Sequence, residues 1–365
     1  MRINLQKCLF AMGICLLAGC GNIEKEIKPV REEQLANQTM TTGRIDYSVY
    51  QSVLQDGTYQ TSPIRGLTAS GLQNGYNQKN FERGLLRLSH QAFSAEDFYF
   101  KEGQALDEAT VKAWLGRESE DNPLGLNTAD SNTPLVFQQL LAYDFIKADG
   151  NTLGGVSLGF AFNRSFTQDG TTIDISREAM MKQVHRSVSA VLTRMRKIAG
   201  YENIPIQVNI FEQAPANQLT GGQFIYTAIS EAGGQSIDEY EEVTESVLLL
   251  PVFDSVQNLA TDKGINQSFL TFKKAVQKAF PDLVGVTGFV YFVEEEVVDL
   301  TIKIDSKYFG QSEIASFTQF IGKQVEVMFA EIPGNVSVEV SAVHVPQAVI
   351  TRPASSEQVT SHIFE

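Results

Sequence analysis

Cysteine is scarce in this sequence, and all of it lies near the N-terminus. Cys8, Cys15 and Cys20 are the three cysteines among 365 residues. The chain beyond residue 20 therefore has no thiol that could form an internal disulfide or act as a nucleophile. A secreted body of this length must be held by its hydrophobic cores alone, and the chain is long enough to build them.

Long apolar runs and excess positive charge are also lacking after the N-terminal segment. No later segment approaches the ~20 apolar residues that a transmembrane helix needs. The 43 acidic residues outnumber the 29 basic ones, which gives a formal net charge of −14. A surface of that sign repels nucleic acid and anionic lipid headgroups, so neither is an expected partner.

Familiar patterns of metal ligands and phosphate loops are missing as well. The 4 histidines lack the HxH or HExxH spacing of a zinc site, and no glycine pair is followed by Gly-Lys-Ser/Thr. The acidic runs 238–242 and 294–296 lack the alternating oxygen ligands and glycine of a calcium loop. We therefore expect no catalytic residue, no metal and no cofactor, because an enzyme would need a site gathered from distant segments.

The N-terminal segment has the three parts of a secretory signal peptide. Arg2 and Lys7 form a positive region, residues 8–18 form an apolar region, and small residues lead to Cys20. The apolar region is too short to remain in a bilayer as a spanning helix. The segment is therefore expected to direct secretion and to be removed.

The end of this segment, Leu17-Ala18-Gly19-Cys20, favours anchoring over release. Signal peptidase II needs a small residue before the cleavage site and a cysteine after it, because diacylglycerol is joined to the sulfur. Cleavage would remove residues 1–19, and two acyl chains on Cys20 would give stable anchoring. We expect a protein held on the extracytoplasmic face of the cell membrane through this lipid. The alternative is an ordinary secretory signal with an incidental cysteine.

The rest of the chain predicts an α+β fold in two tandem units. Runs rich in β-branched and aromatic residues alternate with amphipathic helices, and the order β-β-α-β occurs twice. The first set comprises 135–147, 154–163, 177–199 and 204–212, and the second comprises 286–293, 297–304, 312–329 and 335–345. This repetition predicts a structural duplication with mainly antiparallel sheets packed by helices.

The same patterns divide the chain into segments. They are a signal peptide (1–19), a lipidated tether (20–45), an N-terminal domain (46–256), a C-terminal domain (257–348) and a loose tail (349–365). Tether and tail are polar and lack a sustained apolar period, as flexible segments do. The domain boundary is expected near 254–264, with 213–222 as the alternative.

One loop has the composition of a ligand site. Residues 71–77 combine amides, glycines and Tyr76 before a helix that Asn77 is expected to cap. Amide-rich loops backed by aromatic rings suit the binding of a sugar or peptide. The alternative is a packed loop that satisfies its own backbone. The candidate ligand residues are Asn74, Gly75, Tyr76, Asn77 and Trp114.

Three segments of the body, with the LAGCG end of the signal, share the pattern of one family. They read YQSVLQDG followed by YQTSPIRGL, then GLQNGYNQKNFERGLLRLS, and then YFKEGQALDEATVKAWLGR followed by NPLGLN. In these segments the chain resembles the CamS family of sex-pheromone lipoprotein precursors of Gram-positive bacteria.

The resemblance implies that the discarded signal peptide is trimmed to a short hydrophobic peptide and exported as a mating signal. The equivalent stretch here is Gly13 to Gly19, which is apolar as expected. It departs from the family's active peptides by its internal Cys15, its glycine at both ends and its lack of an aromatic residue. Membership would therefore predict release of a peptide, and leave its activity open.

Three functions follow from these observations. The first is a membrane-anchored lipoprotein whose signal peptide carries the information. The second is an extracytoplasmic binding module whose body captures a cell-wall fragment, a peptide or a host ligand. The third is an envelope enzyme. The sequence does not determine the oligomeric state.

Overall fold

The computed structural model describes residues 40–364 apart from residues 43, 45–48, 169–170, 253–263, 281–282, 308–309 and 355. The expected signal peptide, the lipidation site at Cys20 and most of the expected tether lie outside these residues. The described chain begins with a small sheet of β1 (Met40–Thr41), β2 (Val53–Gln55) and β3 (Thr58–Tyr59). The end of the expected tether therefore pairs with the body, since β1 is antiparallel to β2.

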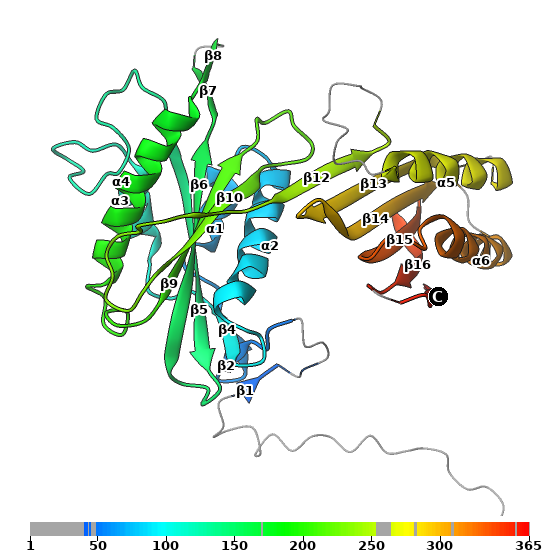
Figure 1. The fold of residues 1–365 in the computed structure, drawn as a ribbon, viewed down its shortest axis with the longest axis horizontal. Helices are drawn as coiled ribbons and strands as arrows, with labels where there is room; N and C mark the ends of the chain where they lie inside the picture. The colour runs from blue at the N-terminus through cyan, green and yellow to red at the C-terminus, as the bar shows by residue number, and fades with distance from the viewer. Residues whose placement is uncertain are drawn as a thin grey trace, which may run out of the picture.

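The first unit is a six-stranded sheet with helices on both faces (Figure 1). Its strand order is β11-β10-β9-β6-β5-β4. The strands are β4 (Phe98–Glu102), β5 (Phe137–Lys147), β6 (Leu153–Asn163), β9 (Ile206–Gln213), β10 (Gln223–Ser230) and β11 (Glu241–Glu242). The pair β6–β9 is parallel and the others are antiparallel. A hairpin of β7 (Ser165–Gln168) and β8 (Thr171–Asp174) projects beyond the sheet (Figure 1).

The helices divide between the two faces of this sheet. α3 (Glu108–Leu115) and α4 (Arg177–Met195) cover one face, and α2 (Gly75–Ala92), which follows α1 (Arg65–Gly71), covers the other. Side chains alternate along β5 as the strand period requires. Leu140 joins the core beneath α4, whereas Leu141 and Phe145 join the core beneath α2.

The second unit is another six-stranded sheet, in the order β12-β13-β14-β15-β16-β17. The strands are β12 (Glu245–Leu250), β13 (Leu283–Val293), β14 (Glu296–Ser306), β15 (Asn335–Ala342), β16 (Val345–Arg352) and β17 (Thr360–Ile363). α5 (Ile265–Ala279) and α6 (Gln311–Met328) both pack on one face, around Phe269, Phe317 and Ile302. The opposite face carries no described helix of this unit.

The two units repeat one topology in full. Each runs β-α-β-β-α-β-β-β along the chain, if the added β7–β8 hairpin is set aside. In each, the third and fourth sheet strands are the parallel pair, β6–β9 or β14–β15, and the remaining pairs are antiparallel. The expected α+β duplication is therefore confirmed, and it extends to eight elements where the sequence showed four.

The boundary between the units differs from the expected one. β12 pairs with β13 and so belongs to the second sheet, although it precedes the expected boundary at residue 256. The units therefore meet between Glu242 and Glu245. The alternative at 213–222 also fails, because β10 pairs with β9 of the first sheet. The cause is long-range pairing, since α5 separates β12 from its partner in the chain.

The expected loose tail is also part of the second sheet. β16 extends to Arg352 and pairs with β15, and β17 pairs with β16. Ile350 is fully buried, and the Arg352 guanidinium donates to the carbonyls of Ile332 and Gly334 in the loop before β15. The polar composition of 349–365 reflects an edge strand with one solvated face rather than a flexible end.

A buried carboxyl lies under the C-terminal end of α4. Asp144 on β5 is 5% exposed and accepts hydrogen bonds from the Tyr201 hydroxyl at 3.1 Å and from the Gln104 amide at 3.3 Å. Burial raises the pKa of Asp144 to about 6, and the hydrogen bonds oppose that rise. The folded state therefore binds a proton that the unfolded chain, with a carboxyl pKa of about 3.9, has already released at that pH.

This pKa difference predicts that stability falls as pH rises from about 4 to about 7. Because the folded-state pKa is the higher one, the stabilisation is complete below the unfolded pKa and is lost as pH rises through the folded pKa. Asp144→Asn, which keeps an acceptor for Tyr201, should raise the free energy of unfolding by roughly 2 kcal/mol at pH 7.5 and little at pH 4. Urea unfolding at both pH values measures the effect.

Asp149 supplies the matched control. The Thr152 hydroxyl and the amides of Thr152 and Asn151 donate to its carboxyl, and these bonds lower its pKa to about 2. Asp149→Asn should therefore destabilise the fold at neutral pH, opposite to the Asp144 variant. The interpretation of Asp144 is wrong if both asparagine variants change stability in the same direction at pH 7.5.

Candidate functional site

The candidate ligand loop at 71–77 binds the chain's own backbone. α2 begins at Gly75 and is capped by Asn74, whose Oδ1 accepts from the Asn77 amide at 2.8 Å. The Asn74 side-chain amide also donates to carbonyls in the 215–218 loop. Asn77 is fully buried and joins the backbones of Ala214 and Gly222. The sequence placed the cap three residues too late because Asn77 has this second structural role.

The remaining candidate residues are not brought together. Tyr76, in the first turn of α2, is 46% exposed. Trp114 is 5% exposed and belongs to the core beneath α3 and α4, on the other side of the sheet from α2. The Arg194 guanidinium lies 5.1 Å from the Trp114 ring centroid, so this indole face contacts the chain itself. No single surface therefore presents the loop and Trp114 to a ligand.

A serine motif within β6 also has a structural role. Residues 155–159 read G-V-S-L-G, which fits the G-x-S-x-G pattern of a nucleophile elbow. That pattern requires a sharp turn between a strand and a helix, whereas Ser157 lies in the middle of a strand and is fully buried. Its hydroxyl donates to Gln207 and accepts from Asn209. It joins neighbouring strands and is closed to substrates.

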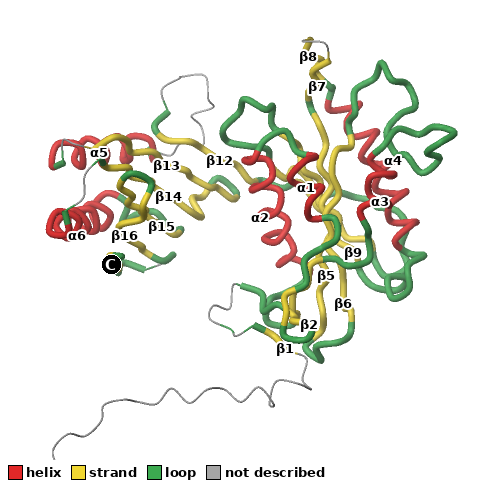
Figure 2. The backbone as a smooth tube through the Cα atoms, turned by 180° about the vertical axis from the view of Figure 1, so that it is seen from behind, coloured by secondary structure: helices red, strands yellow, loops and turns green. Residues whose placement is uncertain are grey.

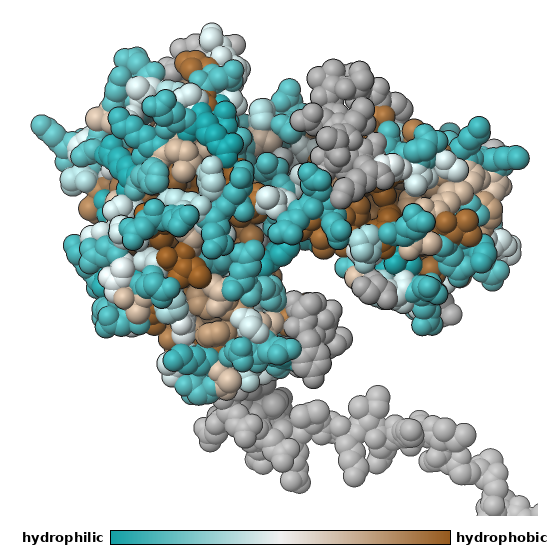
Figure 3. Space-filling view, viewed as in Figure 1, coloured by the Kyte–Doolittle hydropathy of each residue, from teal (hydrophilic) through white to brown (hydrophobic). Residues whose placement is uncertain are grey.

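The described residues form a substantial cleft where the two units meet. Its volume is about 630 Å³, within the range of ligand pockets in proteins. One wall is the outer face of α2 with the start of β10, and the other is the open face of the second sheet (Figures 1 and 2). The surface is hollowed between the units in the space-filling view (Figure 3). Its lining side chains include Asn80, Arg83, Leu86, Arg87, His90, Gln223, Glu245, Phe289, Tyr291 and Asp299.

α2 reaches both units because its two sides differ in character. Phe81, Leu85 and Leu88 recur at steps of three and four and are buried against the first sheet. Lys79, Arg83 and Arg87 follow at steps of four on another side of the helix. This basic row faces the second sheet. It was visible in the sequence as three cations in an otherwise acidic chain, but without the second sheet nothing indicated what it faced.

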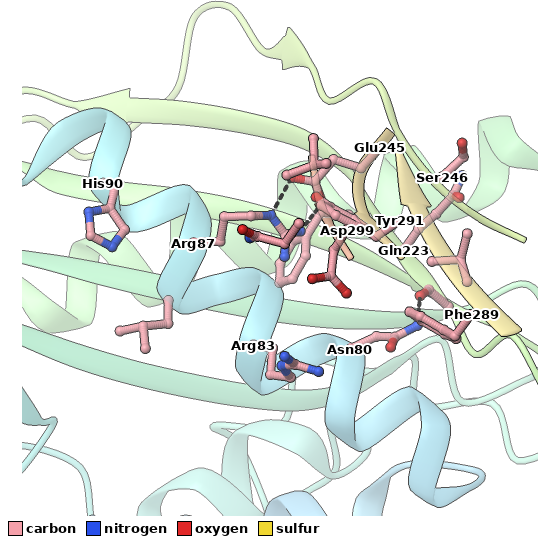
Figure 4. A pocket seen from close by; sticks show the side chains of 16 residues that line it. Asn80, Arg83, Arg87, His90, Gln223, Glu245, Ser246, Phe289, Tyr291 and Asp299 are labelled. Atoms are coloured by element: carbon pink, nitrogen blue, oxygen red, sulfur yellow. Dashed lines mark hydrogen bonds and ion pairs between the residues drawn. The ribbon is translucent and has the colours of Figure 1, made fainter. Parts of the chain in front are cut away.

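An ion pair crosses between the units at one end of the cleft. Arg87 donates to both carboxylate oxygens of Glu245 on β12, in the two-pronged geometry that suits guanidinium and carboxylate. The Glu245 side chain is 8% exposed and that of Arg87 is 36% exposed. The guanidinium also lies 4.3 Å from the Tyr291 ring centroid (Figure 4). Burial raises the pKa of Tyr291; the charge of Arg87 opposes this rise and the Glu245 carboxylate adds to it.

The middle of the cleft has a cation without a partner. Arg83 makes no hydrogen bond or ion pair within the part of the chain that the structure describes, and it projects toward the second sheet (Figure 4). Lys79 lies 5.7 Å from the Phe289 ring centroid. Asp299 projects into the same space from β14 and accepts a hydrogen bond from Thr301 at 3.0 Å. Burial raises the pKa of Asp299, and the charges of Arg83 and Lys79 oppose that rise.

His90 closes the other end of the α2 wall. Its ring stacks on Tyr50, with centroids 4.2 Å apart and planes 22° apart. Burial lowers the pKa of His90, so the neutral ring is favoured. Among the described residues, no group of three or more His, Cys, Asp or Glu is placed to hold a metal ion. The cleft therefore offers cations, carboxylates, amides and aromatic faces for binding.

The comparisons with known proteins agree with the fold. A chain described as the sex pheromone precursor from Lactobacillus salivarius subsp. salivarius has a crystal structure that matches with a TM-score of 0.82 and 30% identity. That match covers 89% of this chain and 99% of the other. The C-terminal domain of the sex pheromone staph-cAM373 precursor from Staphylococcus aureus matches with a TM-score of 0.70 and 26% identity, over 82% of this chain and 100% of that domain. No curated protein matches the chain.

A sequence profile identifies the same family. The profile described as the CamS sex pheromone cAM373 precursor matches residues 59–358. This range includes both six-stranded sheets except for β17. The profile and the solved relative together establish that this chain belongs to the CamS family of sex pheromone cAM373 precursors.

Proposed function

We propose that this chain is a lipoprotein precursor that yields two products when it is cut before Cys20. The body is anchored to the extracytoplasmic face of the membrane by lipid on that cysteine. The leader is the source of a short hydrophobic peptide, Gly13 to Gly19. The supporting observation is the combination of family membership with the Leu17-Ala18-Gly19-Cys20 sequence.

The described fold is compatible with removal of the leader. Every buried hydrophobic residue of the described body lies between Tyr50 and Ile350. Cleavage after residue 19 therefore removes nothing from any described core. None of the described helices has both the length and the apolar character to cross a membrane. Attachment through lipid supplies an anchor without such a helix.

A second proposal concerns the body, and the cleft between the units supports it. We propose that the body is a binding module, because about 630 Å³ of space is lined by an unpaired arginine, a half-buried aspartate and two aromatic rings. The 71–77 loop lies at the start of the same helix, although its amides hold the 214–222 backbone. The third possibility, an envelope enzyme, has no supporting observation among the described residues.

Anchoring is tested by replacing the cysteine. Cys20→Ser removes the sulfur that accepts diacylglycerol, so the chain should keep residues 1–19 and lose the mass of the lipid. Fractionation of the producing cells and intact mass spectrometry measure both effects. Cys15→Ser, in the apolar region, should be processed like the unmodified chain. The proposed anchor would be refuted if the Cys20→Ser protein had the lipidated mass of the unmodified protein and fractionated with it.

Peptide release is tested in culture medium. Mass spectrometry should detect the fragment Gly13–Gly19, and the Cys20→Ser strain should not release it, because processing of the leader depends on that cut. The synthetic peptide, applied at about micromolar concentration, should induce clumping or conjugation in a responding strain. A silent peptide would argue against a signalling role, and its absence from the medium would argue against release.

Binding by the body is tested with the mature chain, residues 20–365 with Cys20→Ser, against a panel of envelope ligands. A ligand of the folded state at about 100 times its Kd adds about 2.7 kcal/mol, which corresponds to several degrees in Tm. Gln223→Trp, which fills the cleft, should abolish the shift, whereas Gln267→Trp on the outside of α5 should not. Shifts that survive Gln223→Trp would place binding elsewhere.

A further inference from the structure

The charges in and beside the cleft leave one positive charge uncompensated. Arg83 and Arg87 line the cleft with the carboxylates Glu245 and Asp299, and Lys79 lies beside it over the Phe289 ring as a third cation. Lys303 and Glu339, farther along the same sheet face, pair with each other at 3.5 Å. A local excess of positive charge in a chain with a formal net charge of −14 favours an anion in this cleft.

Arg83 is the residue that carries this excess. Arg87 is already paired with Glu245, and Lys79 lies against the Phe289 ring. Arg83 has no ion pair or hydrogen bond within the described residues, and Asp299 faces it without forming a contact ion pair. Its guanidinium keeps all its donors for a ligand, and two of them match the two oxygens of one carboxylate.

The cleft around Arg83 also carries aromatic and apolar surface beside its charged groups. Phe289 and Tyr291 provide ring surfaces on one wall, and Leu86 faces them from α2. The Tyr291 hydroxyl is buried without a hydrogen-bond partner among the described residues. The Gln223 side-chain amide likewise makes no hydrogen bond to a described residue. One exposed amide next to ring and apolar surface fits the polar backbone and uncharged side chains of a peptide.

We propose that this cleft binds a short peptide with uncharged side chains, and that the peptide's C-terminal carboxylate pairs with Arg83. The peptide's side chains lie over Phe289 and Tyr291, and Gln223 bonds its backbone. This inference rests on the second proposal above, that the body is a binding module. It adds the class of ligand and the residue that recognises it.

The two carboxylates in the cleft argue against the main alternatives. A phosphate monoester carries nearly two negative charges at neutral pH and would be repelled by Glu245 and Asp299. A neutral sugar would leave the exposed Arg83 charge without a counterion in the cleft. A single carboxylate with an uncharged body satisfies the charge balance and the aromatic wall together.

The test uses the mature chain with Cys20→Ser and a synthetic peptide of residues 13–19, GICLLAG, under reducing conditions. This peptide has uncharged side chains and a free carboxylate at Gly19. Calorimetry should detect binding, and C-terminal amidation should weaken it about tenfold or more, because a hydrogen-bonded charge pair is lost. The peptide is added directly, so the result does not depend on its release by cells.

The variant that isolates the interaction is Arg83→Gln. It should weaken binding of the free acid about tenfold. In this variant the acid and the amidated peptide should bind with nearly equal affinity, because the carboxylate has lost its partner. Arg186→Gln, which removes another exposed arginine, on α4, should change neither affinity. Thermal unfolding of Arg83→Gln should match the parent, since Arg83 contacts no described residue through a hydrogen bond or ion pair. Arg186→Gln loses an exposed ion pair with Glu118, which should change stability little.

Three results would overturn the proposal. They are equal affinity for acid and amide, an Arg83→Gln variant that binds like Arg186→Gln, and no binding of the peptide up to roughly 1 mM, the weakest affinity expected of a specific site. In the first two cases the body still binds a peptide, so the binding-module proposal stands. Stronger binding of glycerol phosphate than of the peptide would also reject the proposed ligand class.

Discussion

The position of α2 between two sheets is the constraint on which the rest of the molecule depends. Its inner side needs close approach to the first sheet, and glycine provides it. A Cβ at Gly84 would lie 2.6 Å from the Phe224 ring, and one at Gly155 would lie 2.0 Å from Phe93, just beyond the helix. Because these contacts fix the helix, its outer basic row is held toward the second unit. The cleft exists only where that row and the open sheet face meet.

The duplicated topology explains why a cleft forms at this place. Both sheets have one face covered by the two helices that are part of the repeated topology. The first unit covers its other face with α2, which lies outside the repeat, and the second unit has no described counterpart. The second sheet therefore keeps a polar, partly aromatic face that no described helix covers. α2 alone covers the outer face of the first sheet and forms the opposite wall of the cleft. The Arg87–Glu245 pair joins them at the edge.

Local pattern predicted much of this fold, and long-range pairing accounts for what it missed. The β-β-α-β order and the buried face of α2 followed from side-chain periodicity, as Phe81 and Leu85 show. β12 and β17 were misassigned because their partners lie across a helix or a polar turn. The site was missed for a related reason. The amide-rich composition of 71–77 predicted a ligand site, but these amides bind the chain's own backbone. Arg83 faces Asp299 on the second sheet, more than 200 residues away in the chain, which no local pattern indicates.

The parallel pair in each sheet has a consequence for how the chain acquires its shape. In the first unit Ser157 and Gln207 are 50 positions apart, and in the second Thr301 and Ser337 are 36 apart. Closing the longer loop costs only about 0.3 kcal/mol more, so chain entropy does not decide which unit forms first. Order of emergence decides instead. The unit that carries α2 is synthesised first, and it can present a finished surface against which the later sheet assembles. No oxidation step delays either event.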